Sequence, residues 1–212
     1  METQETSDKN IGVILLAAGA SSRLGTPKQL LAYVGQTLLQ HSLQAAKDSA
    51  AGSVVVVLGA QADTIKSQVD KADAHIVINA DWPEGMACSI RYGVKALMDI
   101  HPSIEGAILM VCDQPFVTAS VINELIAAHQ KTGKPIITCG YGHTYGPPTL
   151  FHKSMFPELL QLQGDVGARS ILGLHTDQVE MISFPEGTLD IDTPTDYQKL
   201  SAGNLSEGNG KV

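Results

Sequence analysis

Residues 11–31 read IGVILLAAGASSRLGTPKQLL, and this stretch decides the fold class. Its first eight residues are small or aliphatic without a break, which is typical of a parallel strand covered on both faces. A loop of small and polar residues follows, bracketed by Gly19 and Gly25, with the basic residues Arg23 and Lys28 in it or just after it. A buried strand that opens into such a loop predicts an α/β protein whose ligand lies at the carboxyl end of the strand.

The same change from strand to helix recurs along the chain. Further strands are predicted from short, mostly aliphatic runs at residues 54–58, 75–79, 106–111 and 134–138. Helices are predicted from apolar side chains at helical spacing in residues 37–51, 63–70, 86–99 and 118–130. This alternation favours a mostly parallel central sheet with right-handed crossovers and helices on both faces.

Beyond residue 140 the pattern becomes irregular. A Gly-Pro-Pro run occupies residues 146–148, a helix is expected near 154–162, a strand at 179–184 and a last helix from about residue 194. We expect this half to decorate the sheet and to cover the substrate site. Residues 1–10 and 201–212 are polar and carry few large apolar side chains, so we expect them to be disordered tails around one domain at 11–200.

Composition excludes several classes of protein. With 14 Lys and Arg against 22 Asp and Glu, the formal charge is −8, so the chain lacks the positive field that binds nucleic acid. The longest apolar run is too short to cross a membrane and the first residues are acidic, which predicts a cytoplasmic protein rather than a membrane or secreted one. Cys88, Cys112 and Cys139 lack metal-ligand spacing and are expected to be buried, reduced thiols.

The loop after the first strand has the features of a triphosphate cradle. Gly19 and Gly25 allow backbone N–H groups to approach phosphates closely, and Arg23 and Lys28 supply local positive charge. It is neither a G-x-x-x-x-G-K-[ST] loop nor the G-x-G-x-x-G of dinucleotide-binding proteins, which disfavours a dehydrogenase. The alternative is a tight turn with solvated basic side chains.

Three aspartates are candidates for holding Mg²⁺. Asp113 lies just past the carboxyl end of the strand at 106–111, where ligands of open α/β sheets bind, although it could instead cap the helix that begins near Thr118. Asp190 and Asp192 would share one face of an extended segment, where two like charges repel unless a cation lies between them. For Asp192 the alternative is that it, or Thr193, caps the last helix.

Residues 16–31 match the L-A-A-G-x-S-x-R-x-G-x-x-K-x-L signature, and the chain thereby resembles the nucleotidyltransferases that attach CMP or GMP to the molybdenum cofactor. The resemblance implies a Rossmann-like nucleotidyltransferase fold, with Lys28 on the transferring α-phosphate and Asp113, in a C-D-x-P motif, on the metal. It also implies that Asp190 and Asp192, in a D-x-D-T-P element, close the metal site. The nucleotide-binding residues implied are Leu16, Ala17, Ala18, Gly19, Ser21, Ser22, Arg23, Gly25, Lys28 and Ser89.

Two later motifs resemble the cytidylyltransferase branch that serves molybdopterin. These are residues 146–151, GPPTLF, and residues 164–169, GDVGAR, and they imply an acceptor site at Gly146, Pro148, Asp165 and Arg169. Arg169 could bind the acceptor phosphate in a bidentate manner, or pair with Asp165 at the surface. Pro147 stands where the family usually has a histidine, and His143 is close enough in sequence to replace it. Trp82 is expected to pack rather than to stack on a base.

The expected activity is therefore Mg²⁺-dependent transfer of CMP from CTP to the terminal phosphate of molybdopterin, with Lys28, Arg23 and Asp113 as catalytic residues. A phosphate monoester is largely dianionic at neutral pH, so its attack needs no general base. The second alanine, Ala18, is typical of the cytidylyl branch. A guanylyltransferase, an enzyme acting on a sugar or alcohol phosphate, and a nucleotide-binding regulatory module remain alternatives. A molybdoenzyme would receive the product, and no nucleic acid or membrane partner is expected.

Overall fold

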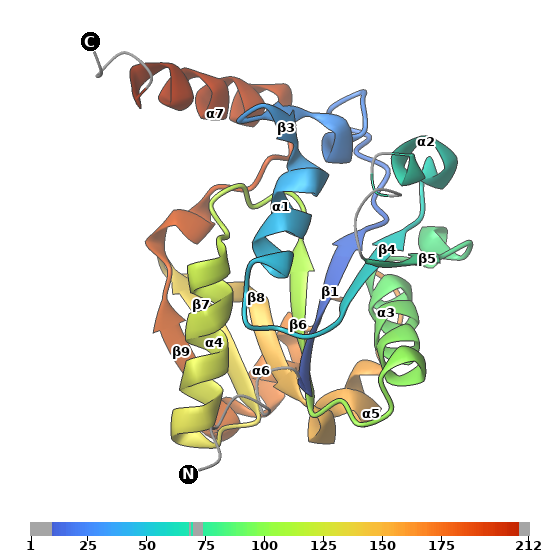
Figure 1. Ribbon diagram of the computed structural model, residues 1–212, viewed down its shortest axis with the longest axis vertical. Coiled ribbons are helices and arrows are strands. Elements are labelled where there is room, and N and C mark those ends of the chain that lie inside the picture. Colours follow the sequence, from blue (N-terminus) through green and yellow to red (C-terminus); the bar gives the residue numbers. More distant parts are fainter. Residues whose placement is uncertain (1–9, 68, 70–73, 208–212) are drawn as a thin grey trace.

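The computed structural model describes residues 10–67, 69 and 74–207. Its core is a seven-stranded sheet in the order β5-β4-β1-β6-β8-β7-β9, in which only β8 runs antiparallel to its neighbours (Figure 1). The strands of this sheet are β1 (Ile11–Ala17), β4 (Val54–Leu58), β5 (His75–Ile78), β6 (Gly106–Val111), β7 (Ile136–Tyr141), β8 (Thr144–His152) and β9 (Val179–Ser183). The prediction of an α/β nucleotidyltransferase fold with a mostly parallel sheet is confirmed.

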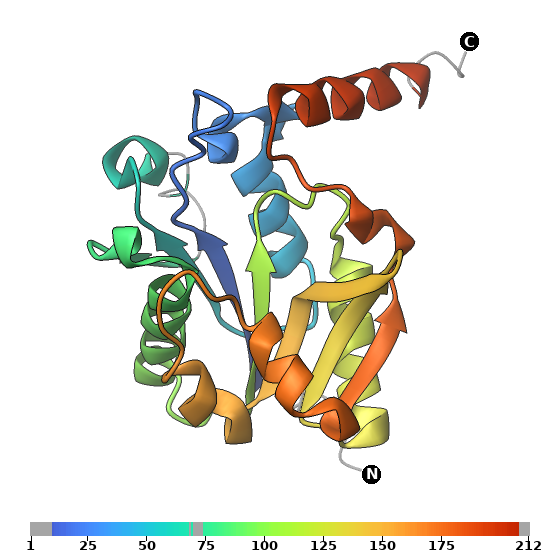
Figure 2. The ribbon, with the colours of Figure 1, turned by 180° about the vertical axis from the view of Figure 1, so that it is seen from behind.

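Helices cover both faces of the sheet. Along β1, Val13 and Leu15 pack with α1 and α4 in one buried cluster, while Ile14 packs with α3, α5 and α6 in another, as the alternation of side chains along a strand requires (Figure 2). The helices are α1 (Leu38–Lys47), α2 (Ala62–Lys66), α3 (Met86–Ile100), α4 (Ala119–Thr132), α5 (Phe156–Leu159), α6 (Arg169–Leu174) and α7 (Pro194–Glu207).

Smaller elements join these. Short 3₁₀ helices are η2 (Lys28–Leu30), η3 (Trp82–Glu84), η4 (Lys153–Met155), η5 (Thr176–Gln178) and η6 (Pro185–Thr188). A two-stranded ribbon consists of β2 (Ala32–Tyr33) and β3 (Gln36–Thr37). The helix expected at 37–51 is shorter than predicted: it begins at Leu38, because Thr37 caps it with Gln40 completing a capping box, and it ends at Lys47 with Asp48 as the C-cap. The helix expected at 63–70 ends at Lys66, and part of that range lies outside the described residues.

The prediction for the chain beyond residue 140 was partly wrong, because β8 lies inside the sheet between β6 and β7. Its Gly-Pro-Pro run indicated a break, since proline cannot donate to a ladder. In the structure the pairing of β7 with β8 passes from Thr138–Thr149 to Cys139–Gly146, so Pro147 and Pro148 are left out of the ladder at a bulge. The prolines therefore sacrifice no ladder hydrogen bond at that point.

The final helix begins at Pro194, as expected. α7 runs to Glu207, so the boundary predicted at residue 200 falls inside it, and Leu200 packs with Tyr33, Leu38 and Ile191 in a small third cluster. The N-terminal expectation for residues 1–9 and the C-terminal one for 208–212 lie outside the described residues. Within the described ranges, none of the helices combines the length and apolar character needed to span a bilayer.

Candidate active site

The loop that follows β1 is held from beneath by Gln29, a residue that the sequence pattern did not single out. Its side chain is fully buried, and Nε2 donates to the carbonyl oxygens of Ala17 (2.8 Å) and Gly19 (3.0 Å). The only available signal was a polar residue between Lys28 and two leucines. Gln29 thus fixes the point at which the chain leaves the sheet.

Ser21 completes this framework. Its backbone has a φ of +54°, and its hydroxyl accepts the Lys28 N–H (2.9 Å) while lying 3.4 Å from Gln29 Oε1. A φ in this region is costly for any residue other than glycine, so the hydroxyl contacts are needed to hold the Ser21 backbone in this conformation. Ser21 therefore positions Lys28, whereas Ser22 and Arg23 remain exposed.

The loop leaves open space above Gly19. A Cβ placed on Gly19 would meet no atom within 4 Å, and the same is true of Gly25, whose φ is +72°. Leu16, Ala17 and Ala18 face inward: Ala17 and Ala18 are buried and Leu16 packs on the α3 side of the sheet. Leu16 pairs with Val57 and Val111 in the sheet, and the carbonyls of Ala17 and Ala18 accept hydrogen bonds from Gln29 Nε2 and the Ala60 N–H, so these three residues support the loop.

Lys28 joins the loop to both acidic segments. Its ammonium binds the Asp113 carboxylate and also Asp192 Oδ1 at 2.9 Å, while Arg23 Nη2 binds the other oxygen of Asp192 at 2.9 Å. The two acidic segments are also linked directly, because the Ile191 N–H donates to the Asp113 carbonyl (3.0 Å). Residues that are 85 and 164 positions apart in the chain from Lys28 thus converge on one ammonium group.

Asp113 does not cap α4, and of the two residues considered as a cap for the last helix it is Thr193 that takes this role. Thr118, not Asp113, stands at the N-cap of α4. Thr193 and Asp196 exchange hydrogen bonds at the start of α7, with the Thr193 hydroxyl donating to Asp196 Oδ2 (2.6 Å) and accepting the Asp196 N–H (3.3 Å). Asp192 is therefore free to face Lys28.

The charges respond to this arrangement. Burial alone would lower the pKa of Lys28, but the Asp113 charge and hydrogen bonds to Asp113 and Asp192 outweigh it, and the net pKa is raised. The hydrogen bond from Lys28 lowers the pKa of Asp192. Burial of its carboxyl group, and then the negative charge of Asp113, raise the pKa of Asp190 to about 6. Lys28 is therefore fully charged at neutral pH.

Asp190 lies near the cluster of Lys28, Asp113 and Asp192, but among the described residues it forms no ion pair with Lys28. The predicted alternation is observed, since Ile191 is fully buried and Leu189 packs in the same cluster, which turns Asp190 and Asp192 the other way. In the described residues, however, Asp113, Asp190 and Asp192 do not meet within 4.8 Å as a ready-made set of three ligands. Of the three predicted metal ligands, the structure brings Asp113 and Asp192 together.

One atom of Asp113 has no partner. Its Oδ1 is buried and accepts no hydrogen bond from the described residues, although its other oxygen binds Lys28. A buried, unpaired carboxylate oxygen is costly, and a hard divalent cation is a group that would satisfy it. The donor chemistry at this point therefore fits Mg²⁺.

A pocket of about 370 Å³ lies on the other side of the loop, which is large enough for a small ligand. Its walls come from the loop after β1, from the start of α3 and from one later residue; the lining is Ala18, Gly19, Ala20, Trp82, Pro83, Glu84, Gly85, Met86, Ser89 and Asp165. Ser89 is almost fully buried here, and its hydroxyl accepts a hydrogen bond from Asn79 (3.0 Å). Trp82 also packs against the α3 side of the core, as expected.

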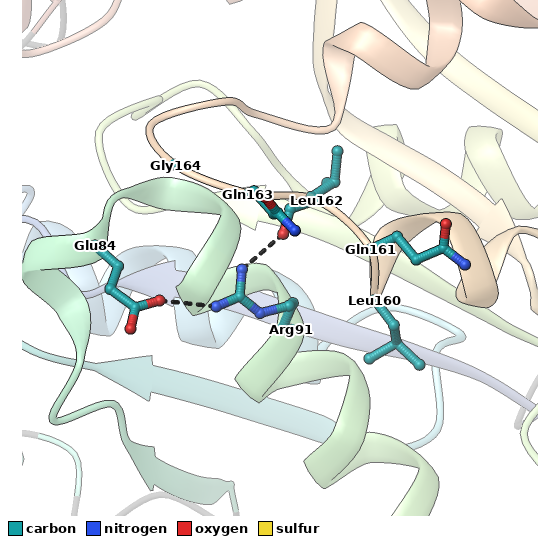
Figure 3. Close-up of a pocket in the computed structure, with 7 residues that line it drawn as sticks. All are labelled: Glu84, Arg91, Leu160, Gln161, Leu162, Gln163 and Gly164. Atoms are coloured by element: carbon teal, nitrogen blue, oxygen red, sulfur yellow. Dashed lines mark hydrogen bonds and ion pairs between the residues drawn. The ribbon is translucent and has the colours of Figure 1, made fainter.

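The segment predicted to bind the acceptor is tied to the same helix. Asp165 Oδ1 accepts the Met86 N–H (3.3 Å), and the Gly164 carbonyl accepts the Ala87 N–H (3.2 Å). Figure 3 shows Arg91 between the two parts, with one arm on Glu84 (2.9 Å) and the other on the Leu162 carbonyl (2.6 Å). The start of α3 and residues 162–165 therefore form one unit.

Arg169 and Gly146 line a second, apolar pocket beside α6. Arg169 lies over the Tyr145 ring, 5.1 Å from its centroid, and none of the ion pairs in the described residues joins it to Asp165. Pro148 is buried in β8. His143 lines a different pocket, with Met181 and Pro185, so it does not stand in for the histidine that Pro147 replaces.

Residues 13–179 match the model of the MobA-like NTP transferase domain. The chain belongs to this family. Among relatives it is similar to nicotine blue oxidoreductase of Paenarthrobacter nicotinovorans, at 30% identity over 88% of this chain and 94% of the relative. Among solved structures it is similar to the Rv0371c homologue of Mycobacterium sp. strain JC1, at 33% identity and a TM-score of 0.81, covering 94% of this chain and 98% of that one.

A structure of Mycobacterium tuberculosis Rv0371c in complex with manganese is also similar, at 29% identity and a TM-score of 0.74, covering 90% of this chain and 97% of that one.

In this MobA-like domain the three cysteines are buried and free, as predicted. Asp81, Glu84 and Cys88 place their ligand atoms within 4.8 Å of one another, which sequence spacing did not reveal. Asp81 and Glu84 already have partners there in Tyr92 and Arg91.

Proposed function

We propose that this MobA-like domain is a Mg²⁺-dependent nucleotidyltransferase that transfers CMP from CTP to the terminal phosphate of molybdopterin. The observation that carries the proposal is the meeting of Lys28, Asp113 and Asp192 beside a loop whose Gly19 leaves open space. Positive charge, carboxylate oxygens and exposed backbone are thus gathered at one place in a chain that is otherwise acidic. Triphosphates require such a combination.

The reaction balances without a proton-transferring residue. A terminal phosphate oxygen of the acceptor attacks the α-phosphorus of CTP, a new P–O–P bond forms, and the bond to the β-phosphate breaks to release pyrophosphate. The acceptor phosphate is largely dianionic at neutral pH because its second pKa is about 6. Catalysis is then positioning and stabilisation of charge, for which Lys28 and Arg23 are placed on the two sides of Asp192.

Mg²⁺ would be held by Asp113 and Asp192, with Asp190 beside them, and it would supply positive charge to the phosphate oxygens. The unpaired Asp113 Oδ1 supports this, as does the existence of a manganese complex of a similar protein. The Lys28 ammonium pairs with the same two carboxylates that would hold the cation, so the two positive charges would lie close together. Because like charges repel, an anionic triphosphate that contacts both groups is favoured there.

The choice of CTP and of molybdopterin rests on motif resemblance. Ala18 is typical of the cytidylyl branch, and Gly146 and Arg169 match its acceptor motifs. The product would pass to a molybdoenzyme. A guanylyltransferase of the same family is the nearest alternative within this chemistry.

Reduction is the second candidate function, because one relative at 30% identity is named an oxidoreductase. The loop after β1 argues against it, since Gly19 and Gly25 lack the middle glycine of dinucleotide-binding loops. Titration with NAD⁺ and NADH, followed by fluorescence, separates the two functions: the transferase proposal expects no saturable binding.

The deciding experiment is pyrophosphate release by the purified protein with Mg²⁺, molybdopterin and each of the four ribonucleoside triphosphates. We expect release with CTP and none when Mg²⁺ or molybdopterin is omitted. Release with GTP alone would make the protein a guanylyltransferase. Binding of CTP without release under any of these conditions would overturn the proposal in favour of a regulatory module.

A further inference from the structure

The apolar pocket beside α6 has a composition that sets it apart from the nucleotide side. It holds about 170 Å³ between β6, β8, α3 and α6. Five of its hydrophobic lining residues, Ile90, Leu109, Met110, Phe151 and Leu172, are at most 4% exposed. The others are Met86, Val111, Gly146, Pro147, Thr149, Gly167, Ala168 and Arg169.

Hydrogen-bonding groups are scarce in this lining. The Thr149 hydroxyl is already committed to the Gly146 carbonyl (3.0 Å) and to the Thr138 hydroxyl (2.9 Å). Arg169, an exposed residue at the start of α6, is the one charged side chain among the lining residues. A polar group that entered the pocket would lose its hydrogen bonds to water without replacement, at a cost of roughly 1–3 kcal/mol each.

The volume limits what fits. A dry cavity of about 150 Å³ lined by aliphatic and aromatic side chains accepts one benzene molecule. A pocket of about 170 Å³ therefore admits a single six-membered ring or a branched alkyl group. A bicyclic pterin with its ring of polar edge atoms is both too large and too polar for it.

The pocket adjoins both halves of the candidate active site. Met86 lines it and also lines the pocket of about 370 Å³ beside the loop after β1. Val111 lines it and stands two residues before Asp113, so their Cα atoms are at most about 7 Å apart. Pro147, which replaces the family histidine, also lines it, so an apolar residue stands where a hydrogen-bonding side chain is usual.

We propose that this pocket binds a small hydrocarbon group, a single ring or a branched alkyl chain, carried by a phosphate-bearing acceptor whose anion contacts Arg169. The inference rests on the proposed nucleotidyl transfer only in assigning the group to the acceptor. When molybdopterin is the acceptor, its pterin ring lies outside the pocket. The chain therefore recognises a class of acceptor beyond molybdopterin, namely small aryl or alkyl phosphate monoesters.

Binding tests the pocket without any turnover. Fluorobenzene, observed by ¹⁹F NMR, is expected to bind saturably, and benzyl phosphate to compete with it. Ala168→Leu places a larger side chain in the pocket wall and should weaken the binding of both compounds by at least about tenfold. Leu174→Ala, at the other end of α6, changes a residue that is 77% exposed and should leave both affinities unchanged. If Ala168→Leu fails to fold, Pro147→His provides the second variant and should weaken fluorobenzene binding.

Arg169 and the acceptor assignment have their own tests. Benzyl phosphate should bind roughly tenfold more tightly than benzyl alcohol, and Arg169→Gln should remove that difference. In an assay that measures the CMP adduct of molybdopterin, benzyl phosphate should raise the apparent KM for molybdopterin and leave that for CTP unchanged. Absence of saturable fluorobenzene binding, or equal affinity of the wild type and folded Ala168→Leu for fluorobenzene, would overturn the proposal that the pocket binds a hydrocarbon group. Pocket binding in a protein that releases no pyrophosphate would overturn the proposed function instead.

Discussion

Lys28 is the residue on which the two halves of the candidate site depend. Its ammonium neutralises Asp113 and Asp192, and its backbone N–H is held by Ser21. The side chains of Lys28 and Asp113 are both only 16% exposed, so this pair is screened far less than a surface pair. The Arg23–Asp192 pair differs, because Arg23 is 68% exposed, and it contributes little to stability.

Replacing Lys28 by alanine should lower the turnover number by about 10² or more. The expected size is that of losing a donor that stabilises charge in a transition state. The measurement is pyrophosphate release at saturating CTP and molybdopterin, with circular dichroism to verify folding. Lys66→Ala removes one exposed lysine from α2 and serves as the control. Turnover equal to that of the wild type in a folded Lys28→Ala protein would remove Lys28 from the mechanism.

Gln29 should prove to be a stability residue for the loop. In Gln29→Leu the carbonyl groups of Ala17 and Gly19 lose their donor, which should lower the free energy of unfolding by roughly 1–3 kcal/mol. Urea unfolding gives this value. Gln44→Leu, on the exposed face of α1, should change it by less than about 0.5 kcal/mol. Equal stability of the two variants would contradict the role given to Gln29.

The sequence predicted Lys28 and Asp113 but not Gln29, for a physical reason. A charged residue next to a glycine loop, or just after a buried strand, has a chemical role that its position alone suggests. The role of Gln29 depends on two carbonyl groups ten and twelve residues earlier, which come within reach only once the loop has folded back. Asp190 was predicted together with Asp192 as a metal ligand, but among the ion pairs of the described residues those of Lys28 are with Asp113 and Asp192.

At the scale of elements, strands that are buried on both faces were predicted best. β4 and β6 begin and end at the residues predicted from their aliphatic runs, because short runs of this kind are typical of strands buried on both faces. β8 was missed because its prolines indicate a break, and only the bulge opposite Thr138 and Cys139 explains how they are accommodated. Which distant strands pair, and in which register, cannot be predicted from the spacing of residues within one segment.

The contact between α3 and residues 162–165 yields a prediction of its own. Arg91 joins Glu84 to the Leu162 carbonyl, and so holds the start of α3 and residues 162–165 together. Arg91→Ala should reduce kcat/KM for molybdopterin by roughly tenfold, because small displacements of reacting groups are costly. Arg91→Lys should recover only part of it, since one ammonium cannot serve both partners in the same geometry.

The measurement is steady-state pyrophosphate release, with the thermal midpoint recorded for each variant. A purely structural role would lower the thermal midpoint and the amount of active enzyme but leave the KM for molybdopterin unchanged. That result would contradict the positioning role of Arg91. Lys95→Ala, on the next turn of α3, is the control for loss of a positive charge.

At the scale of the whole molecule, the three cysteines report on global opening. Burial raises the pKa of the Cys112 and Cys139 thiols to about 12, and it also raises that of Cys88. Little thiolate therefore exists in the native protein at pH 8, and none of the three is accessible. We expect Ellman's reagent to label no thiol in native protein and three in 6 M guanidinium. Rapid labelling of one thiol without unfolding would contradict this packing.

The central claim is that acids from distant parts of the chain hold a divalent cation against a nucleotide at the glycine loop. Mn²⁺, observed by electron paramagnetic resonance during titration in the presence of CTP, tests it most directly. We predict saturable binding that is at least about tenfold weaker in both Asp113→Asn and Asp192→Asn, and unchanged in Asp63→Asn on α2. Equal Mn²⁺ affinity in the wild type and all three variants would contradict the account.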